Sequence, residues 1–454
     1  ALSEFPRSEL SYVNRLEWDI LNTQIPRELA LLRFPYYEEV FSPLLGVQVQ
    51  LPVLLAEYAF TSEEDVDIYL RLLAKTDAYF EELCEYEKKK AAAGLFMTDE
   101  SVDAVIAGCQ DFLDGADYHN SNPSNINQNT PENISVTDID SVQNSRETSV
   151  ILNESSGEID EHFLVTSFSE RLTGLVQSTK LSDRQILNYV NLNQQMLEAH
   201  VFPAYAHLIE TLSSLKGSGA NPYGLAHYPE GRSYYQALTD AIIGSDRTLS
   251  EIRDLIDHQL LSDVRQMAEL VKNRPELLTD VPRTTTAREP EQILAELQAR
   301  MLADFPAADA NAHTGADTDS SASSIPISVK SVSPSLQEHT SLADELTYTV
   351  KTVVPSLQKQ LSPAFYLTPP LDAMRDHVIY INPAADYDPL TLFTTLAHEG
   401  FPGHLYQTLS EQTSPQHPVR SFFYFGGFVE GWATYAELYS YGICRMEEPA
   451  ARLL

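Results

Sequence analysis

Two short stretches hold the residues whose types and spacing could do chemistry. The first reads LAHEGFPGH and supplies His398, Glu399 and His404, and the second begins with the string EGWA at Glu430. Catalytic zinc is held by imidazoles and carboxylates, with one open position for a water whose pKa the ion lowers to near neutrality. The sequence therefore predicts one Zn²⁺ per chain, bound by His398, His404 and Glu430.

The spacing of the two histidines requires a break in the helix. His398 and His404 are six residues apart, whereas the histidines of a helical HExxH motif are four apart and share one face. In an ideal α-helix, six residues rotate a side chain by about 240°. Proline removes a backbone donor and glycine adopts dihedrals that other residues avoid. Because the intervening sequence is GFPG, we expect an unwound turn over 400–403 that returns His404 to the metal.

The glutamates around the histidines have separate expected roles. Glu399 follows the first histidine, so we expect it to act as general base, taking a proton from the attacking water and passing it to the leaving amine. Glu430 and Glu437 are seven residues apart and share one face of an expected helix. We favour Glu430 as the third ligand and Glu437 as the residue that orients a ligand histidine, with Glu437 as the alternative ligand.

Five further residues are candidates for substrate contact. The guanidinium of Arg232 suits bidentate pairing with a substrate carboxylate, and such pairing would favour carboxypeptidase action. The alternative is that Arg232 forms a structural ion pair. Other tyrosines near the motif, Tyr406, Tyr424 and Tyr435, are interpreted as core or cleft wall. The candidate substrate contacts are Tyr366, His377, Tyr380, Arg232 and Tyr235.

A short strand is predicted just before the histidine motif. Residues 377–383 read HVIYINP, with β-branched and aromatic residues bounded by a proline, which suits a short edge strand. An edge strand could line a cleft and bind an extended peptide by strand addition. The alternative is a small sheet without a ligand role.

Amphipathic helical patterns dominate the rest of the chain. They predict a mainly α-helical fold, a large helical bundle with a deep active-site cleft and a small β element near that cleft. Two capping-box spacings, at 61–64 and 248–251, open helical runs. We expect the apolar residues of both runs in the core: Val66, Tyr69, Leu70 and Leu73, then Ile252, Leu255, Ile256 and Leu260.

The domain organisation is predicted to be one α-helical domain over 1–454. Segments at about 115–160 and 307–335 are rich in Ser, Thr, Asn, Asp or Ala and are expected to be low-complexity insertions, with linkers between separate domains as the alternative. The catalytic part is expected at about 341–454.

The composition excludes some partners. The chain of 454 residues has 65 acidic and 30 basic residues and a formal net charge of −35, which repels nucleic acid and anionic membranes. The three cysteines form no CxxC pair. No apolar run reaches the length of about 18 residues that a membrane-spanning helix needs. Neither nucleic acid nor a membrane-spanning segment is expected, and the oligomeric state is left open.

The strings HExxPGH and EGWAxYxE resemble, residue for residue, the bacterial DUF885 family, which is regarded as a family of zinc-dependent peptidases. The resemblance concentrates between residues 366 and 437. It implies a mostly α-helical metallopeptidase, similar in architecture to angiotensin-converting enzyme, thimet oligopeptidase and helical carboxypeptidases. It also implies His398, His404 and Glu430 as ligands and Glu399 as base.

The resemblance also raises an expectation about the end of the chain. Enzymes of this type supply a Tyr or His downstream of the third ligand to stabilise the oxyanion. The chain ends at Leu454, so we expect this donor to lie in a part that the chain lacks. The start, ALSEF, has neither Met nor a signal-peptide pattern; a secreted or cell-surface bacterial location is favoured over the cytoplasm.

Three functions compete at this point. The leading one is a zinc-dependent peptidase acting on short peptides, of carboxypeptidase or oligopeptidase type. The alternatives are a non-catalytic binding protein stabilised by zinc, and a metal hydrolase of non-peptide amides or esters. All three use the same ligands. They differ in whether the chain turns over a substrate and in which substrate it is.

Overall fold

The structure is a computed structural model that describes residues 2–114, 162–178, 181–219, 221–278, 289–305, 348–370, 377–385, 388–413 and 418–444. The insertions predicted at 115–160 and 307–335 lie outside the described residues. The chain divides into two compact units. Unit 1 comprises Ala1–Arg33, Arg232–Val353 and Ser362–Leu454, and unit 2 comprises Phe34–Gly231 and Val354–Leu361. The predicted organisation as a single domain stays a prediction.

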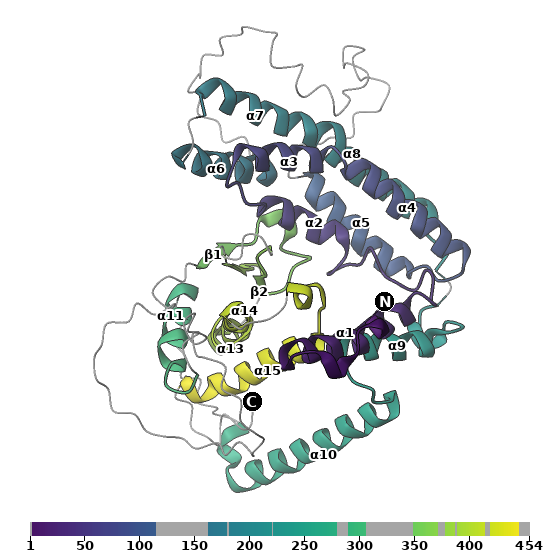
Figure 1. Cartoon of the computed structure of the whole chain (residues 1–454), viewed down its shortest axis with the longest axis vertical. Helices are drawn as coiled ribbons and strands as arrows, with labels where there is room; N and C mark the ends of the chain where they lie inside the picture. Colours follow the sequence, from purple (N-terminus) through teal and green to yellow (C-terminus); the bar gives the residue numbers. More distant parts are fainter. Residues whose placement is uncertain are drawn as a thin grey trace. The chain divides into compact units, whose positions relative to one another are not determined.

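Unit 2 is helical (Figure 1), and its core is rich in aromatic residues. Phe112 stacks on Tyr205 with ring centroids 4.1 Å apart, and Phe168 stacks on Tyr69 at 5.6 Å. Rings of this size bury a large apolar area, so they dominate the packing energy of the unit. Its helices are α2 (Val47–Ala56), α3 (Glu63–Leu73), α4 (Thr76–Ala92), α5 (Asp99–Asp114), α6 (Phe163–Ser178), α7 (Asp183–Met196) and α8 (Phe202–Leu215).

The start of α3 shows how the sequence sets a helix boundary. Ser62 is the N-cap and accepts from the backbone N–H of Asp65, while the Asp65 side chain accepts from the N–H of Ser62. This capping box forms one residue later than the spacing predicted at 61–64. The four apolar residues expected in the core are all buried: Val66, Tyr69, Leu70 and Leu73. The predicted core face of this helix is confirmed.

Unit 1 contains the helices that carry the histidine motif. In it α13 packs on α15 and on α11, with Leu294, Phe393, Leu396 and Ala397 buried between them. Its helices are α1 (Tyr12–Leu31), α9 (Gly231–Ile243), α10 (Leu249–Asn273), α11 (Pro290–Met301), α13 (Pro389–Glu399), α14 (His404–Thr413) and α15 (Gly426–Ile443).

Helix α10 corrects one expectation. Its capping box, formed by Thr248 and Glu251, is present as predicted. However, no residue of α10 is buried, and Leu255, Ile256 and Leu260 are 53%, 59% and 58% exposed. The prediction that this face belongs to the core is wrong, because helical periodicity identifies an apolar face but not a partner that covers it.

The β element is a three-stranded sheet of β1 (Tyr348–Thr352), β2 (Ala364–Leu367) and β3 (His377–Ile381), in the order β1-β3-β2. Strand β3 is parallel to β1 and antiparallel to β2. The predicted strand exists, but the prediction that it is an edge strand is wrong. Every residue of β3 is buried, and a continuous apolar run of this kind is typical of a central strand. Pro383 lies beyond the end of β3 and does not interrupt its pairing.

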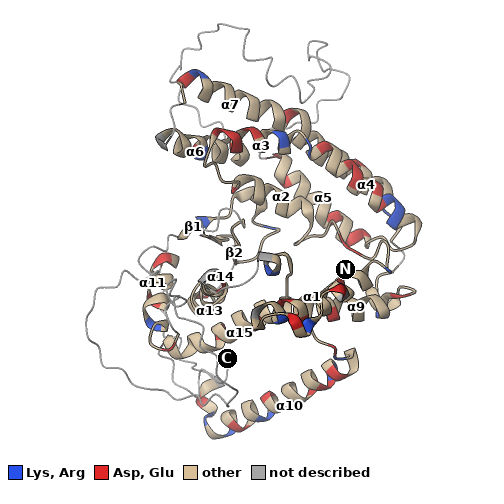
Figure 2. Ribbon diagram, viewed as in Figure 1, with Lys and Arg blue, Asp and Glu red and all other residues tan. Residues whose placement is uncertain are grey.

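The described residues confirm a mainly α-helical fold with a small β element. The deep cleft expected between helices stays a prediction. Figure 2 shows that Asp and Glu are spread over many helices, including α3, α4 and α10. Among the described helices, none combines the length and the apolar character that a membrane crossing requires.

Candidate metal centre

The chain between the two histidines leaves the helix as expected. Asp388 caps α13 by accepting from the N–H groups of Leu390 and Thr391. Helix α13 ends at Glu399 and α14 begins at His404. Residues 400–403 between them are not helical. The predicted break is confirmed.

The two glycines of the turn permit close approach of other groups. A Cβ atom on Gly403 would collide with the carbonyl oxygens of His398 and Ala397, and one on Gly400 would collide with the side chain of Leu294. Neither glycine has a positive φ, so the missing side chain is what the turn requires. Hydrogen bonds from the Gly400 N–H to the carbonyl of Leu396 (2.9 Å) and from the Gln407 N–H to that of Gly403 (2.9 Å) flank the turn.

A tryptophan from α15 fixes the turn from outside. The Nε1 of Trp432 donates to the carbonyl oxygen of Pro402 at 2.8 Å. Its ring also stacks on Tyr406 of α14, with ring centroids 6.3 Å apart. The helix that supplies Glu430 therefore also holds the turn that places His404.

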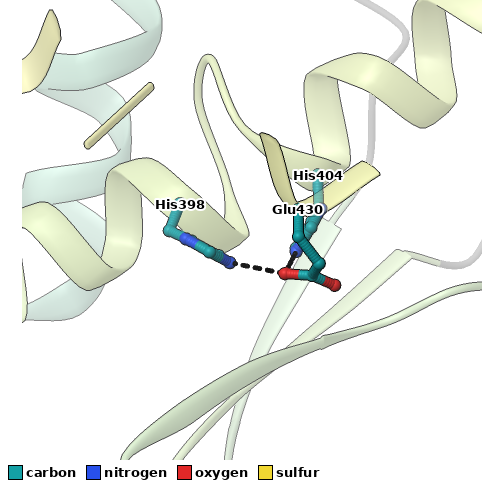
Figure 3. A group of neighbouring side chains, drawn as sticks. All are labelled: His398, His404 and Glu430. Carbon is teal, nitrogen blue, oxygen red and sulfur yellow. Dashed lines mark ion pairs between the residues drawn. The ribbon is translucent and has the colours of Figure 1, made fainter. Parts of the chain in front are cut away.

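The three predicted ligands come together (Figure 3). The Oε2 atom of Glu430 lies 3.5 Å from Nε2 of His398 and 3.7 Å from Nε2 of His404. The two rings are nearly perpendicular, at 88°. Ligands about 2.1 Å from one tetrahedral ion lie about 3.4 Å from each other. The donor set therefore suits Zn²⁺, and the two distances from the carboxylate to the imidazoles are close to this spacing.

The two histidines differ in what their other nitrogen contacts. The Nδ1 of His398 lies 2.6 Å from Oε1 of Glu437. The Nδ1 of His404 is buried and, within the described residues, has no hydrogen-bond partner. Burial and the neighbouring His398 lower the pKa of His404, which favours the neutral imidazole that a metal needs.

Glu399 lies partly buried beside this group. Its Oε2 accepts from the backbone N–H of Tyr366 on β2 at 2.8 Å. Burial raises the pKa of Glu399 to about 7, against the opposing effects of His398 and the Tyr366 N–H. A carboxyl with a pKa near neutrality suits proton transfer at neutral pH.

The sheet separates the predicted substrate contacts. The hydroxyl of Tyr366 lies 2.7 Å from Nδ1 of His377, and their rings are stacked. Both lie on the sheet face that carries Ile379 toward the core with α13. Because side chains alternate along a strand, Tyr380 lies on the opposite face, where it stacks on Phe365 at 4.9 Å.

Arg232 and Tyr235 lie on α9, and both are exposed. The other end of α9, at Ile242 and Ile243, lies against the start of α15. Seven to eleven residues of helix separate these ends, or about 11–16 Å. Among the described residues, no hydrogen bond or ion pair joins Arg232 or Tyr235 to the metal group. Their role as substrate contacts stays a prediction.

Tyr424, interpreted from the sequence as core or cleft wall, is exposed and contacts the metal group. The Tyr424 hydroxyl donates to Oε1 of Glu430 at 2.8 Å. Burial and the carboxylate raise the pKa of Tyr424 to about 12, so it stays a phenol at neutral pH. The only signal in the sequence is its place six residues before Glu430, which does not distinguish it from the other tyrosines.

Comparison with known proteins supports the sequence resemblance. A family model described as "Bacterial protein of unknown function (DUF885)" matches residues 1–453. No curated protein matches the chain. The fold is similar to the crystal structure of "the putative lipoprotein from Colwellia psychrerythraea", with a TM-score of 0.60 and 16% identity over 91% of this chain. The chain spans 61% of the length of that protein.

Proposed function

The chain belongs to the DUF885 family of bacterial proteins of unknown function, and from this premise we propose that it is a zinc-dependent peptidase of short peptides. The observation that carries the proposal is the convergence of His398, His404 and Glu430, whose ligand atoms lie within 4.8 Å of one another. Glu399, with its pKa near 7, lies beside them. This is the set that metal-assisted hydrolysis needs.

The residues divide the work of hydrolysis. His398, His404 and Glu430 would hold Zn²⁺, which lowers the pKa of water and polarises a carbonyl when bound. Glu437 orients the imidazole of His398 through Nδ1. The Tyr366 N–H holds Oε2 of Glu399. This leaves Oε1 to take a proton from the attacking water and to pass it to the leaving amine.

Strand β2 is the best candidate to bind the peptide main chain. One edge of β2 pairs with β3. The N–H of Tyr366 on β2 is not part of this pairing, because it donates to Glu399. An extended peptide can add to an unpaired strand edge through main-chain hydrogen bonds. Such a peptide would run beside the base. The carboxypeptidase and oligopeptidase types both remain part of the proposal.

The location and the completeness of the site are also proposed. The similar solved structure is described as a lipoprotein, which supports a secreted or cell-surface location for this chain. We also propose that full activity needs a Tyr or His that donates to the oxyanion, because the loss of one such donor lowers turnover by about 10²–10³.

The test combines metal analysis with cleavage of a short-peptide library. We expect about one zinc per chain in the wild type and in Glu399→Gln, with cleavage lost only in the variant. Glu269→Gln, at an exposed position of α10, is the control and should cleave normally. Products show whether single C-terminal residues or internal bonds are cut.

Four results would count against the peptidase. A chain that binds no metal, or cleavage that survives in Glu399→Gln, contradicts it. Tight zinc with a large fall in melting temperature on chelation and no turnover indicates the zinc-stabilised binding protein. Turnover of amides or esters but of no peptide indicates the non-peptide hydrolase.

A further inference from the structure

We propose that Tyr424 is a positioning residue for Glu430. It holds the side chain so that one carboxylate oxygen faces the two histidines while the other accepts the hydrogen bond of the Tyr424 hydroxyl. The observation is the 2.8 Å hydrogen bond from the Tyr424 hydroxyl to Oε1 of Glu430. The other oxygen, Oε2, is the atom nearest to both imidazoles. The inference deepens the proposed function, because it concerns the same metal group.

Burial alone does not fix the Glu430 side chain. The side chain is 53% exposed, whereas those of His398 and His404 are 18% and 13% exposed. A glutamate has several rotatable bonds, and holding an exposed one in a single conformation costs side-chain entropy. Tyr424 supplies a neutral donor that acts before any metal binds. The ligand is therefore oriented in advance.

The occupied oxygen also limits how Glu430 can bind. A carboxylate binds a cation through one oxygen or through both. The phenol on Oε1 favours binding through Oε2 alone. Two histidines and one oxygen make three protein ligands, which leaves a position for water or substrate, as in catalytic zinc sites. Without Tyr424, Glu430 could turn both oxygens to the metal and fill that position.

The Tyr424 ring has its own support. It precedes the first turn of α15, and a Cβ on Gly426 would lie 3.1 Å from its Cε1 and 2.7 Å from Cγ2 of Ile242. Such distances are closer than ordinary packing, so Gly426 allows the ring to lie against the start of the helix. The hydroxyl is thereby directed at Glu430, which lies about one helical turn after Gly426.

The experiment compares Tyr424→Phe with Tyr435→Phe. Tyr435 is also about half exposed, at 52%, and lies on the helix that carries Glu430. Its ring is tilted against that of Trp432, and its side chain forms no hydrogen bond to the metal ligands among the described residues. Zinc affinity is measured by competition with a chromophoric chelator. The coordination number is read from the visible absorption of bound Co²⁺, which weakens as ligands are added.

We expect Tyr424→Phe to bind Zn²⁺ about 10-fold more weakly than the wild type and to show weaker Co²⁺ absorption. Tyr435→Phe should match the wild type in both. The melting temperature without metal should be unchanged in both variants, which shows that they fold. Wild-type affinity and absorption in Tyr424→Phe would overturn the inference alone. A wild-type chain that binds neither metal overturns this inference together with the proposed function, whereas metal binding without turnover affects only the peptidase.

Discussion

The Nδ1 atom of His398 lies 2.6 Å from Oε1 of Glu437, and this contact joins α13 to α15. A carboxylate on the far nitrogen of a ligand imidazole fixes its tautomer and orientation, and its loss costs about 10–100-fold in metal affinity. We therefore expect Glu437→Ala to bind zinc 10–100-fold more weakly. Titration against a chromophoric chelator measures this change.

A graded pair of variants separates charge from orientation. Glu437→Gln keeps an oxygen that can accept from Nδ1–H, so its loss of zinc affinity should be smaller than that of Glu437→Ala. Glu269→Ala on exposed α10 should bind zinc as the wild type does. Equal affinities in Glu437→Ala and the wild type would show that the contact does not support the ligand.

Gly403 is expected to be required for the position of His404. A Cβ there would collide with the carbonyl oxygens of His398 and Ala397, so Gly403→Ala must shift the turn. Overpacking of this kind costs about 1–3 kcal/mol, and it moves a ligand. We expect a lower melting temperature and weak zinc binding, measured by thermal unfolding with and without zinc.

The matched control is a glycine with free space around it. A Cβ on Gly442 in α15 would meet nothing within 4 Å. Alanine is favoured over glycine in a helix by about 0.5–1 kcal/mol, so Gly442→Ala should raise the melting temperature slightly and bind zinc normally. If Gly403→Ala behaved like Gly442→Ala, the close approach would not be required.

The sequence predicted much of the candidate site because the needed signals are local. The six-residue separation of His398 and His404, together with Pro402, was sufficient to expect the break. What holds that turn is not local, because Trp432 lies 30 residues away. The contact of Tyr424 with Glu430 depends in the same way on how the chain enters α15. Contacts of this kind are set by tertiary packing, so a pattern in one sequence does not reveal them.

The fold shows the same limit. Thr248 forms the capping box that the sequence predicts, and the box of α3 forms one residue later than predicted, at Ser62 and Asp65; both lie close to their predicted places because a cap involves only neighbouring residues. The apolar faces that follow have different outcomes, since Leu73 is buried and Leu260 is exposed. Likewise the sequence predicts the strand that begins at His377. Its central position depends on pairing with β1, which a local pattern does not reveal.

The different environments of two leucines in unit 1 can be tested directly. Leu297 on α11 is fully buried, whereas Leu260 on α10 is 58% exposed. Leu297→Ala should lower the free energy of unfolding by about 2–5 kcal/mol, and Leu260→Ala should change it by less than about 0.5 kcal/mol. Urea unfolding measures both. A large loss in Leu260→Ala would mean that this face of α10 is covered in solution.

The pH dependence of stability is expected to depend on a carboxyl in unit 2. Glu87 on α4 is fully buried, both of its oxygens lack a hydrogen-bond partner in the described residues, and burial raises its pKa to about 7. Between about pH 4.5 and 7 the folded state keeps this proton and the unfolded state releases it, so stability falls as pH rises through about 7. The full effect is at most about 3 kcal/mol.

Glu87→Gln should lose this part of the pH dependence in urea unfolding at pH 5 and pH 8, whereas Glu82→Gln, exposed on the same helix, should keep it. Parallel pH profiles for the wild type and Glu87→Gln would show that this carboxyl is ionised in the folded protein.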